Sequence, residues 1–203
     1  MRKAEIPAIR KQQLIEATFS VIEVRGIQQT TINHVAKTAG LSVGIVSHYF
    51  GDKNGLMRAV MQKVLSDLKH AINLKMQQNK DNSARGCIVS IIEGNFDTTQ
   101  VNRAAMKVWL NFWASSLYSD ELSQLQKIND HRLYSNLTWY LKKLLPSEKA
   151  RIVAKGLAAI IDGLWLRGSL SQKDEFNKAE AIYIAIEYLD LQLAKYQDHL
   201  VKK

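Results

Sequence analysis

Hydrophobic residues recur at helical spacing along almost the whole chain. Leu14, Ala17 and Val21, for example, follow the i, i+3, i+7 pattern that places side chains on one helix face. Only two prolines, Pro7 and Pro146, interrupt the chain, and helix interiors tolerate proline least. The pattern predicts an all-α fold without strands, with about nine helices near residues 7–25, 31–38, 43–50, 53–77, 84–95, 101–118, 121–144, 148–167 and 175–196.

Positive charge is concentrated in the first part of the chain. Residues 1–80 hold 12 Lys and Arg against 5 Asp and Glu, whereas residues 81–203 hold 16 against 14. A polyanion such as double-stranded DNA is the natural partner of such a region. Charge alone fits a solubilising surface equally well.

The chain offers no pattern typical of an enzyme or of a metal site. Its five histidines show no ligand spacing, and we find no nucleophile–base pair and no phosphate-binding glycine loop. We therefore expect no catalytic residue, no metal and no cofactor. A single cysteine, Cys87, excludes an internal disulfide.

Nothing in the hydropathy pattern indicates a membrane protein. No apolar run approaches the roughly 18 residues of a membrane span, and the basic residues at the beginning are not followed by an apolar stretch. We expect a cytoplasmic protein without a membrane partner. A helical enzyme or a membrane-surface protein using the basic N-terminal third is the alternative class. Core packing explains the amphipathic segment 53–77 better than lipid does.

Two short predicted helices between Thr31 and Phe50 have the features of a helix-turn-helix. Ala36 is small enough for two helices to touch, and Gly40 tolerates the positive φ that the turn needs. Ser42 is placed to cap the second helix. Four residues are spaced to form the small core beneath the motif: Val35, Ala39, Leu41 and Val46.

This arrangement predicts which side chains face DNA. The second helix would enter the major groove with Ser42, Val43, Gly44, Ser47 and His48 near base edges. Val43 or Ile45 suits a thymine methyl, and His48 suits a base edge or a phosphate. Thr31, Tyr49 and Lys53 suit phosphates, which position the protein without reading sequence. Alternatively, the segment is an ordinary helical turn and His48 a surface histidine.

The segment resembles the N-terminal domain of the TetR regulator family. The likeness lies in the Thr-Ile-x-x-Val-Ala-x-x-Ala-Gly-Leu-Ser run from Thr31, the pair Tyr49-Phe50, and Lys53. It implies a homodimeric DNA-binding regulator with a helix-turn-helix domain at 1–52 and an effector-binding and dimerisation domain at 53–203. The DNA-contacting positions of the family would fall on Thr31, Ser42, Val43, Gly44, Ile45, Ser47, His48, Tyr49 and Lys53.

Further segments look like the BetI subfamily of these regulators. They are 42–50, 94–97, 105–110, 112–116 and 157–167, so the likeness covers nearly the whole chain except the tail after about Lys173. The resemblance implies a repressor of glycine betaine biosynthesis from choline, with osmoregulation as its setting, released from double-stranded operator DNA by choline. A TetR-type repressor with a different small cationic or aromatic effector is the alternative.

The aromatic residues suggest where a quaternary ammonium effector binds. Trp109 and Trp113 share one helix face, and Asp162 and Trp165 share another. Aromatic faces and a carboxylate together recognise such a cation. The predicted ligand-binding set is Phe96, Asp97, Trp109, Trp113, Asp162 and Trp165. Plain core packing of the aromatics is the alternative, as is a pairing of Asp162 with Arg167.

The last two predicted helices, 148–167 and 175–196, are the expected dimer interface. In the TetR family such helices form a four-helix bundle with their copies. Small residues at Gly156, Ala159 and Gly163 would allow another helix to approach closely.

Overall fold

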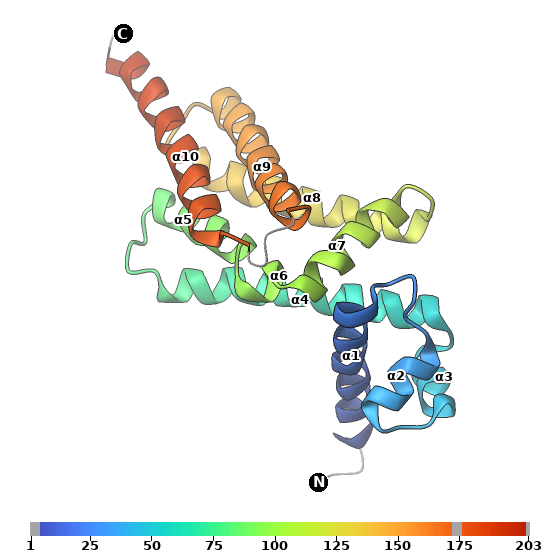
Figure 1. The fold of residues 1–203 in the computed structure, drawn as a ribbon. Coiled ribbons are helices and arrows are strands. Elements are labelled where there is room, and N and C mark those ends of the chain that lie inside the picture. Colours follow the sequence, from blue (N-terminus) through green and yellow to red (C-terminus); the bar gives the residue numbers. More distant parts are fainter. Residues whose placement is uncertain (1–4, 172–175, 202–203) are drawn as a thin grey trace. The chain divides into compact units, whose positions relative to one another are not determined.

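The computed structural model describes residues 5–171 and 176–201, with side chains placed for 6–171 and 176–196 (Figure 1). These residues form helices and no strand, which confirms the all-α prediction. The helices are α1 (Glu5–Arg25), α2 (Ile32–Ala39), α3 (Val43–Phe50), α4 (Lys53–Gln78), α5 (Ala84–Asn95), α6 (Thr98–Val101), α7 (Arg103–Ser116), α8 (Asp120–Leu141), α9 (Ser147–Ser169) and α10 (Lys178–Val201).

Helix α6 is the one described helix that the hydrophobic pattern did not predict. It has four residues, and its first turn is held by Asp97, whose carboxylate accepts hydrogen bonds from the Thr99 amide and hydroxyl at 2.9 Å. A side chain that bonds to the backbone two residues on makes a local turn without any hydrophobic period. The segment therefore carries no hydrophobic period from which a helix could be predicted.

The described part of the chain divides into two compact units. The first unit contains residues 1–66 together with 102–115, and the second contains 67–101 together with 116–203. Helix α4 continues from the first unit into the second, and α7 belongs to the first although α6 and α8 belong to the second. The division into 1–52 and 53–203 remains a prediction.

The first unit is built on one hydrophobic core beneath the helix-turn-helix. Leu14, Ala17 and Val21 of α1 meet residues of α2, α3 and α4, so the three blue helices of Figure 1 share this core. Burying such side chains contributes roughly 1.5–3 kcal/mol for each large one. The core prediction for the motif is confirmed, with Val35, Ala36 and Val46 buried and Ala39 and Leu41 packed against them.

The second unit packs α5 against α8, α8 against α9, and α9 against α10. Several glycines permit close approaches within it. A Cβ at Gly94 of α5 would overlap the backbone of Ile72 on α4, and one at Gly156 of α9 would overlap the Tyr188 hydroxyl on α10. Gly156 therefore serves packing inside the chain, whereas a Cβ at Gly163 would meet no atom within 4 Å.

Candidate functional site

The turn between α2 and α3 is fixed by backbone geometry and by one side chain of α1. Gly40 adopts φ 64°, which L-residues with a side chain rarely adopt, and this confirms its predicted role. The Leu41 amide then donates to the Ala36 carbonyl at 2.9 Å. The Gln13 amide donates to the Ala39 carbonyl at 2.8 Å. The turn is thus tied to the body of the first unit.

The two helix starts of the motif differ in their caps. Thr31 caps α2, because its hydroxyl oxygen accepts a hydrogen bond from the His34 amide at 3.2 Å. Ser42 occupies the N-cap position of α3, but its side chain makes no capping hydrogen bond, so the predicted cap bond was wrong. The Ser42 hydroxyl is exposed and remains available to an external partner.

Helix α3 presents one face to solvent and the other to the core. Ser42, Gly44 and Ser47 are exposed, as are Val43 and His48. Val46 is fully buried. Ile45 is half-buried and packs against the core, which leaves less of its side chain for a base than the prediction assumed. An exposed helix face of hydroxyls, an imidazole and one apolar group has the chemistry that reads base edges in a major groove.

The run Gly51-Asp-Lys-Asn-Gly55 forms the short connection from α3 into the first turn of α4. Gly51 has φ 76°, and Asp52 begins α4 by accepting the Gly55 amide hydrogen bond at 2.8 Å. A Cβ at Gly55 would overlap the Phe50 carbonyl oxygen, so only glycine lets α4 begin this close to α3. Sequence reasoning missed Asp52 and Gly55, although an Asp three residues before a Gly at a helix start is a recognisable signal.

Lys53 and Tyr49, the predicted phosphate anchors, are both half-buried. The Lys53 ammonium donates to the carbonyls of Ile27 and Gln28 at 3.0 and 3.2 Å. An ammonium group has three donors, so one proton remains after these two bonds. The Lys11 ammonium lies 5.9 Å from the centre of the Tyr49 ring, which brings a positive charge beside Tyr49 that sequence reasoning did not consider.

An aromatic cluster lies on α7 in the first unit. The Trp109 ring centre is 6.0 Å from that of Phe112 and 6.1 Å from that of Trp113. Trp109 and Phe112 are buried, with 5% and 3% of their surface exposed. The predicted shared face of Trp109 and Trp113 is therefore present, as a group of three rings.

Phe96 and Asp97, two of the predicted ligand residues, have structural partners in the second unit. Phe96 is fully buried and stacks on Phe176 at 5.9 Å between ring centres. Phe176 also lies against Gly168, where a Cβ would overlap its ring. Asp97 is engaged in starting α6. Sequence reasoning missed Phe176, because its contacts join residues far apart in the chain.

Asp162 of α9 differs from Asp97 in that its carboxyl group has a raised pKa. Its side chain is accessible to solvent, yet desolvation by surrounding protein, helped by the negative charge of Asp130 on α8, raises its pKa to about 6. No ion pair between Asp162 and Arg167 lies within the described ranges. Trp165 is buried on the same helix.

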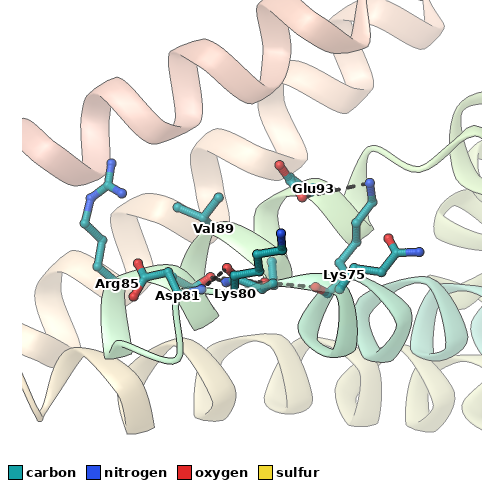
Figure 2. A pocket seen from close by; sticks show the side chains of 10 residues that line it. Lys75, Lys80, Asp81, Arg85, Val89 and Glu93 are labelled. Carbon is teal, nitrogen blue, oxygen red and sulfur yellow. Dashed lines mark hydrogen bonds and ion pairs between the residues drawn. The ribbon is translucent and has the colours of Figure 1, made fainter.

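A polar cavity of about 400 Å³ lies where α4 meets α5 (Figure 2). Its charged groups largely pair: Lys75 points toward Glu93 at 3.9 Å, and Arg85 forms two hydrogen bonds with Asp190 at 2.6 and 2.7 Å. The second pair raises the pKa of the Arg85 guanidinium. None of the cavity's lining residues is aromatic, so it lacks the surfaces that recognise a quaternary ammonium ion.

No group of three His, Cys, Asp or Glu side chains in the described ranges is placed to hold a metal ion. None of the helices that the structure describes is long and apolar enough to cross a membrane.

Comparison with protein families matches both parts of the chain. Residues 14–60 match "Bacterial regulatory proteins, tetR family", and residues 84–194 match "BetI-type transcriptional repressor, C-terminal".

Curated relatives match over nearly the full length. The HTH-type transcriptional regulator BetI of Pseudomonas fluorescens is 52% identical over 197 residues, which is 97% of this chain and 100% of the relative. The regulator of the same name from Proteus mirabilis is 49% identical, covering 98% of each chain.

Solved structures share the fold. A transcriptional regulator from Pseudomonas aeruginosa PAO1 superposes with a TM-score of 0.70 at 25% identity, covering 93% of this chain and 92% of that one. One from Saccharomonospora viridis, solved in complex with choline, gives 0.74 at 20% identity, covering 90% and 96%. Regulators of this kind bind operator DNA as dimers and are not enzymes. The chain belongs to the tetR family of bacterial transcriptional regulators and carries a BetI-type C-terminal domain.

Proposed function

We propose that the protein is a cytoplasmic, homodimeric repressor of the genes that convert choline to glycine betaine, and that choline releases it from its operator. The observation that carries this proposal is the identity of about half of all residues to regulators named BetI, over nearly the full length of both chains. The choline complex of a protein with the same fold supports the choice of effector.

The first part of the proposal assigns the reading of DNA bases to the exposed face of α3. Val43 and His48 contact base edges, and the hydroxyls of Ser42 and Ser47 bond to bases or to nearby phosphates. Gly44 allows close approach, and Ile45 adds an apolar edge. Thr31, Tyr49 and Lys53 hold the phosphates on either side. The Thr31 hydroxyl can still donate a proton while its oxygen caps α2.

The second part of the proposal concerns the effector, for which each unit offers a candidate binding site. In the first unit, Trp109 and Trp113 offer adjacent aromatic faces. In the second, Asp162 offers a carboxylate that no described cation neutralises, three residues from Trp165. Each cation–π contact is worth roughly 0.5–2 kcal/mol. Phe96 and Asp97 suit the role less well, because their side chains already stack on Phe176 and start α6.

The third part of the proposal places the dimer interface on α9 and α10. Both helices carry large apolar side chains that are exposed in the single chain, and such patches mark interaction surfaces. They are Ile152, Leu166 and Leu170 on or just after α9 and Tyr183, Ile184 and Leu191 on α10. A two-fold pairing would cover both helices and present two α3 helices to DNA. Residues 1–52 then form the DNA-binding domain and 53–203 the effector-binding and dimerisation domain.

Gel shifts with promoter DNA from upstream of the choline-oxidation genes test the function. The wild type should bind this DNA, and millimolar choline should weaken the complex. Val43→Glu should abolish binding, because it adds a negative charge to the face that meets phosphates. Leu74→Glu is the matched control, since Leu74 on α4 is 40% exposed and Val43 is 43% exposed.

Each outcome discriminates between functions. Failure of the wild type to bind promoter DNA would overturn the repressor. Binding that ignores choline would overturn the effector and favour a different small cationic or aromatic one, which a thermal-shift screen of quaternary ammonium compounds would identify. Equal binding by the Val43→Glu and Leu74→Glu variants would overturn the role of α3.

A further inference from the structure

Helix α7 has an unusual place in the chain. Residues 102–115 belong to the same compact unit as α1, α2 and α3, but the chain before and after them belongs to the second unit. The helix is therefore joined covalently at both ends to the second unit, and the BetI-type match covers α7 together with both of these junctions. Any change in the second unit that pulls on residues 101 or 116 acts directly on α7.

One side chain of α7 forms hydrogen bonds with the end of α1. The Lys107 ammonium donates to the backbone carbonyls of Glu23 at 2.5 Å and Ile22 at 3.4 Å. These are two of the last four carbonyls of α1, which ends at Arg25, and the Ile22 carbonyl also accepts a hydrogen bond from the Gly26 amide at 2.8 Å. A helix C-terminus carries unsatisfied carbonyls and the negative end of the helix dipole, so an ammonium group there is held by both.

Helix α1 shares its buried core with α3. Leu14, Ala17 and Val21 of α1 lie in one buried core with Val46 of α3. The Gln13 side chain adds a hydrogen bond to the carbonyl of Ala39, at the end of α2. A displacement of α1 at Glu23 therefore moves α2 and α3 with it, because a close-packed core transmits strain.

The aromatic cluster and Lys107 lie on opposite sides of α7. At about 100° per residue, Lys107 is about 200° around the helix from Trp109. Phe112 and Trp113 lie near Trp109 on the same side. A rotation or shift of α7 driven from its aromatic side therefore also moves Lys107, because both groups lie on one helix.

We propose that Lys107 is the positioning residue that couples the effector state of the protein to its DNA-binding helices, through its hydrogen bonds to the last carbonyls of α1. The proposal rests on the proposed function, in which an effector controls DNA binding. It assigns to Lys107 neither effector contact nor DNA contact. Loss of the ammonium leaves both binding sites intact and removes the link between them.

The first experiment measures this link directly. Promoter affinity is determined with and without choline for the wild type, Lys107→Met, Lys107→Arg and Lys127→Met. Methionine keeps the length of the side chain and removes the donors, and Lys127 is an exposed lysine of α8 that serves as control. The wild type, Lys107→Arg and Lys127→Met should show an affinity ratio of fivefold or more, the usual scale of allosteric coupling. For Lys107→Met the ratio should fall below about twofold.

Choline binding, measured by calorimetry without DNA, should be unchanged in Lys107→Met. This separates a coupling role from a merely structural one, which would lower choline affinity as well. A wild-type affinity ratio in Lys107→Met would overturn the proposal.

A second experiment does not depend on the effector. Coupling is reciprocal, so promoter binding must change amide hydrogen exchange in α7 if Lys107 carries the link. The wild type should show this change at residues 103–116, and Lys107→Met should lose it while still binding DNA. If choline has no effect on the wild type but the exchange result holds, the effector assignment fails and the coupling role survives. If promoter binding leaves exchange in wild-type α7 unchanged, the coupling role fails.

Discussion

The helix-turn-helix of the first unit and the candidate effector residues of the second unit use their side chains in opposite ways. On α3 Val43, Ser47 and His48 are exposed and Ile45 and Tyr49 are half-buried, while Val46 is fully buried in the core. In the second unit, Phe96 stacks on Phe176 and Asp97 holds the start of α6. Only Asp162 keeps an accessible carboxylate among these candidates of the second unit.

This difference explains why the candidate DNA-binding residues can be recognised in the sequence and the candidate effector residues cannot. A surface that reads DNA is made by one helix, so its residues are neighbours in the chain and alternate with core positions at helical spacing. A pocket for a small cation is made by side chains from several helices, and each of them looks like an ordinary core residue. The glycines of the two units differ in the same way: Gly40 is required by its backbone angle and Gly94 by its neighbours.

The largest effect is expected for Gly94→Ala in the second unit. The new Cβ would overlap the backbone of Ile72, which cannot move as a flexible side chain can, so the free energy of unfolding should fall by about 3 kcal/mol. Gly163→Ala is the matched control, because no atom lies within 4 Å of its Cβ position and alanine favours helix by roughly 0.5–1 kcal/mol. Urea unfolding measures both. Equal stabilities of the two variants would refute the close approach of α5 to α4.

His48→Ala tests whether the exposed face of α3 contributes to DNA binding without contributing to stability. We expect promoter affinity to fall about tenfold, in line with the roughly 1–3 kcal/mol of a good base contact, with unfolding free energy unchanged within about 0.5 kcal/mol. His70→Ala, an exposed histidine of α4, is the control for loss of an imidazole. Fluorescence anisotropy gives the affinity. A large loss of stability in His48→Ala would show that the imidazole contributes to packing and is not free to contact DNA.

Gly40→Ala should cost about 1 kcal/mol of unfolding free energy, because an L-residue with a side chain is strained at φ 64°. Since no atom lies within 4 Å of the Cβ position, the cost comes from the backbone angle alone. Thermal unfolding of this variant and of Gly94→Ala shows whether the strained backbone angle or the overlap with Ile72 costs more stability. A loss at Gly40 as large as that at Gly94 would mean that the turn is constrained by packing as well.

Asp162→Asn should give the smallest effect and one that depends on pH. The folded-state pKa of about 6 lies above the ordinary value of 3.8, so the ionised carboxylate destabilises the fold at pH above 6 and this penalty disappears as pH falls toward 4. The variant should therefore be slightly more stable than the wild type at pH 8 and no more stable at pH 4.

The same substitution tests Asp162 as an effector carboxylate. Choline affinity of the wild type should fall about threefold from pH 8 to pH 5 as Asp162 takes up a proton, since choline itself keeps its charge and a partly screened ion pair contributes less than about 1 kcal/mol. Asp162→Asn should bind choline with no such pH dependence when titrated by calorimetry. A wild-type pH profile in the variant would remove Asp162 from the proposed site.

Much of the first unit follows from its sequence alone. The apolar spacing, the glycine at the turn and the exposed face of α3 were all predicted from residues within twenty positions of one another, because a helix-turn-helix is a local structure. The Ser42 cap bond was the local detail that was wrong. The nine longer helices were likewise visible in the hydrophobic period, whereas α6 was not.

Tertiary structure decided what joins distant parts of each unit. The ammonium of Lys107 at the end of α1, the ring of Phe176 between Phe96 and Gly168, and the raised pKa of Asp162 beside Asp130 all depend on residues far apart in the chain. The period of a helix tells which side chains turn inward, but it carries no information on which helix they meet. Contacts of this kind lie between helices. For that reason only the tertiary structure decides which residues make them.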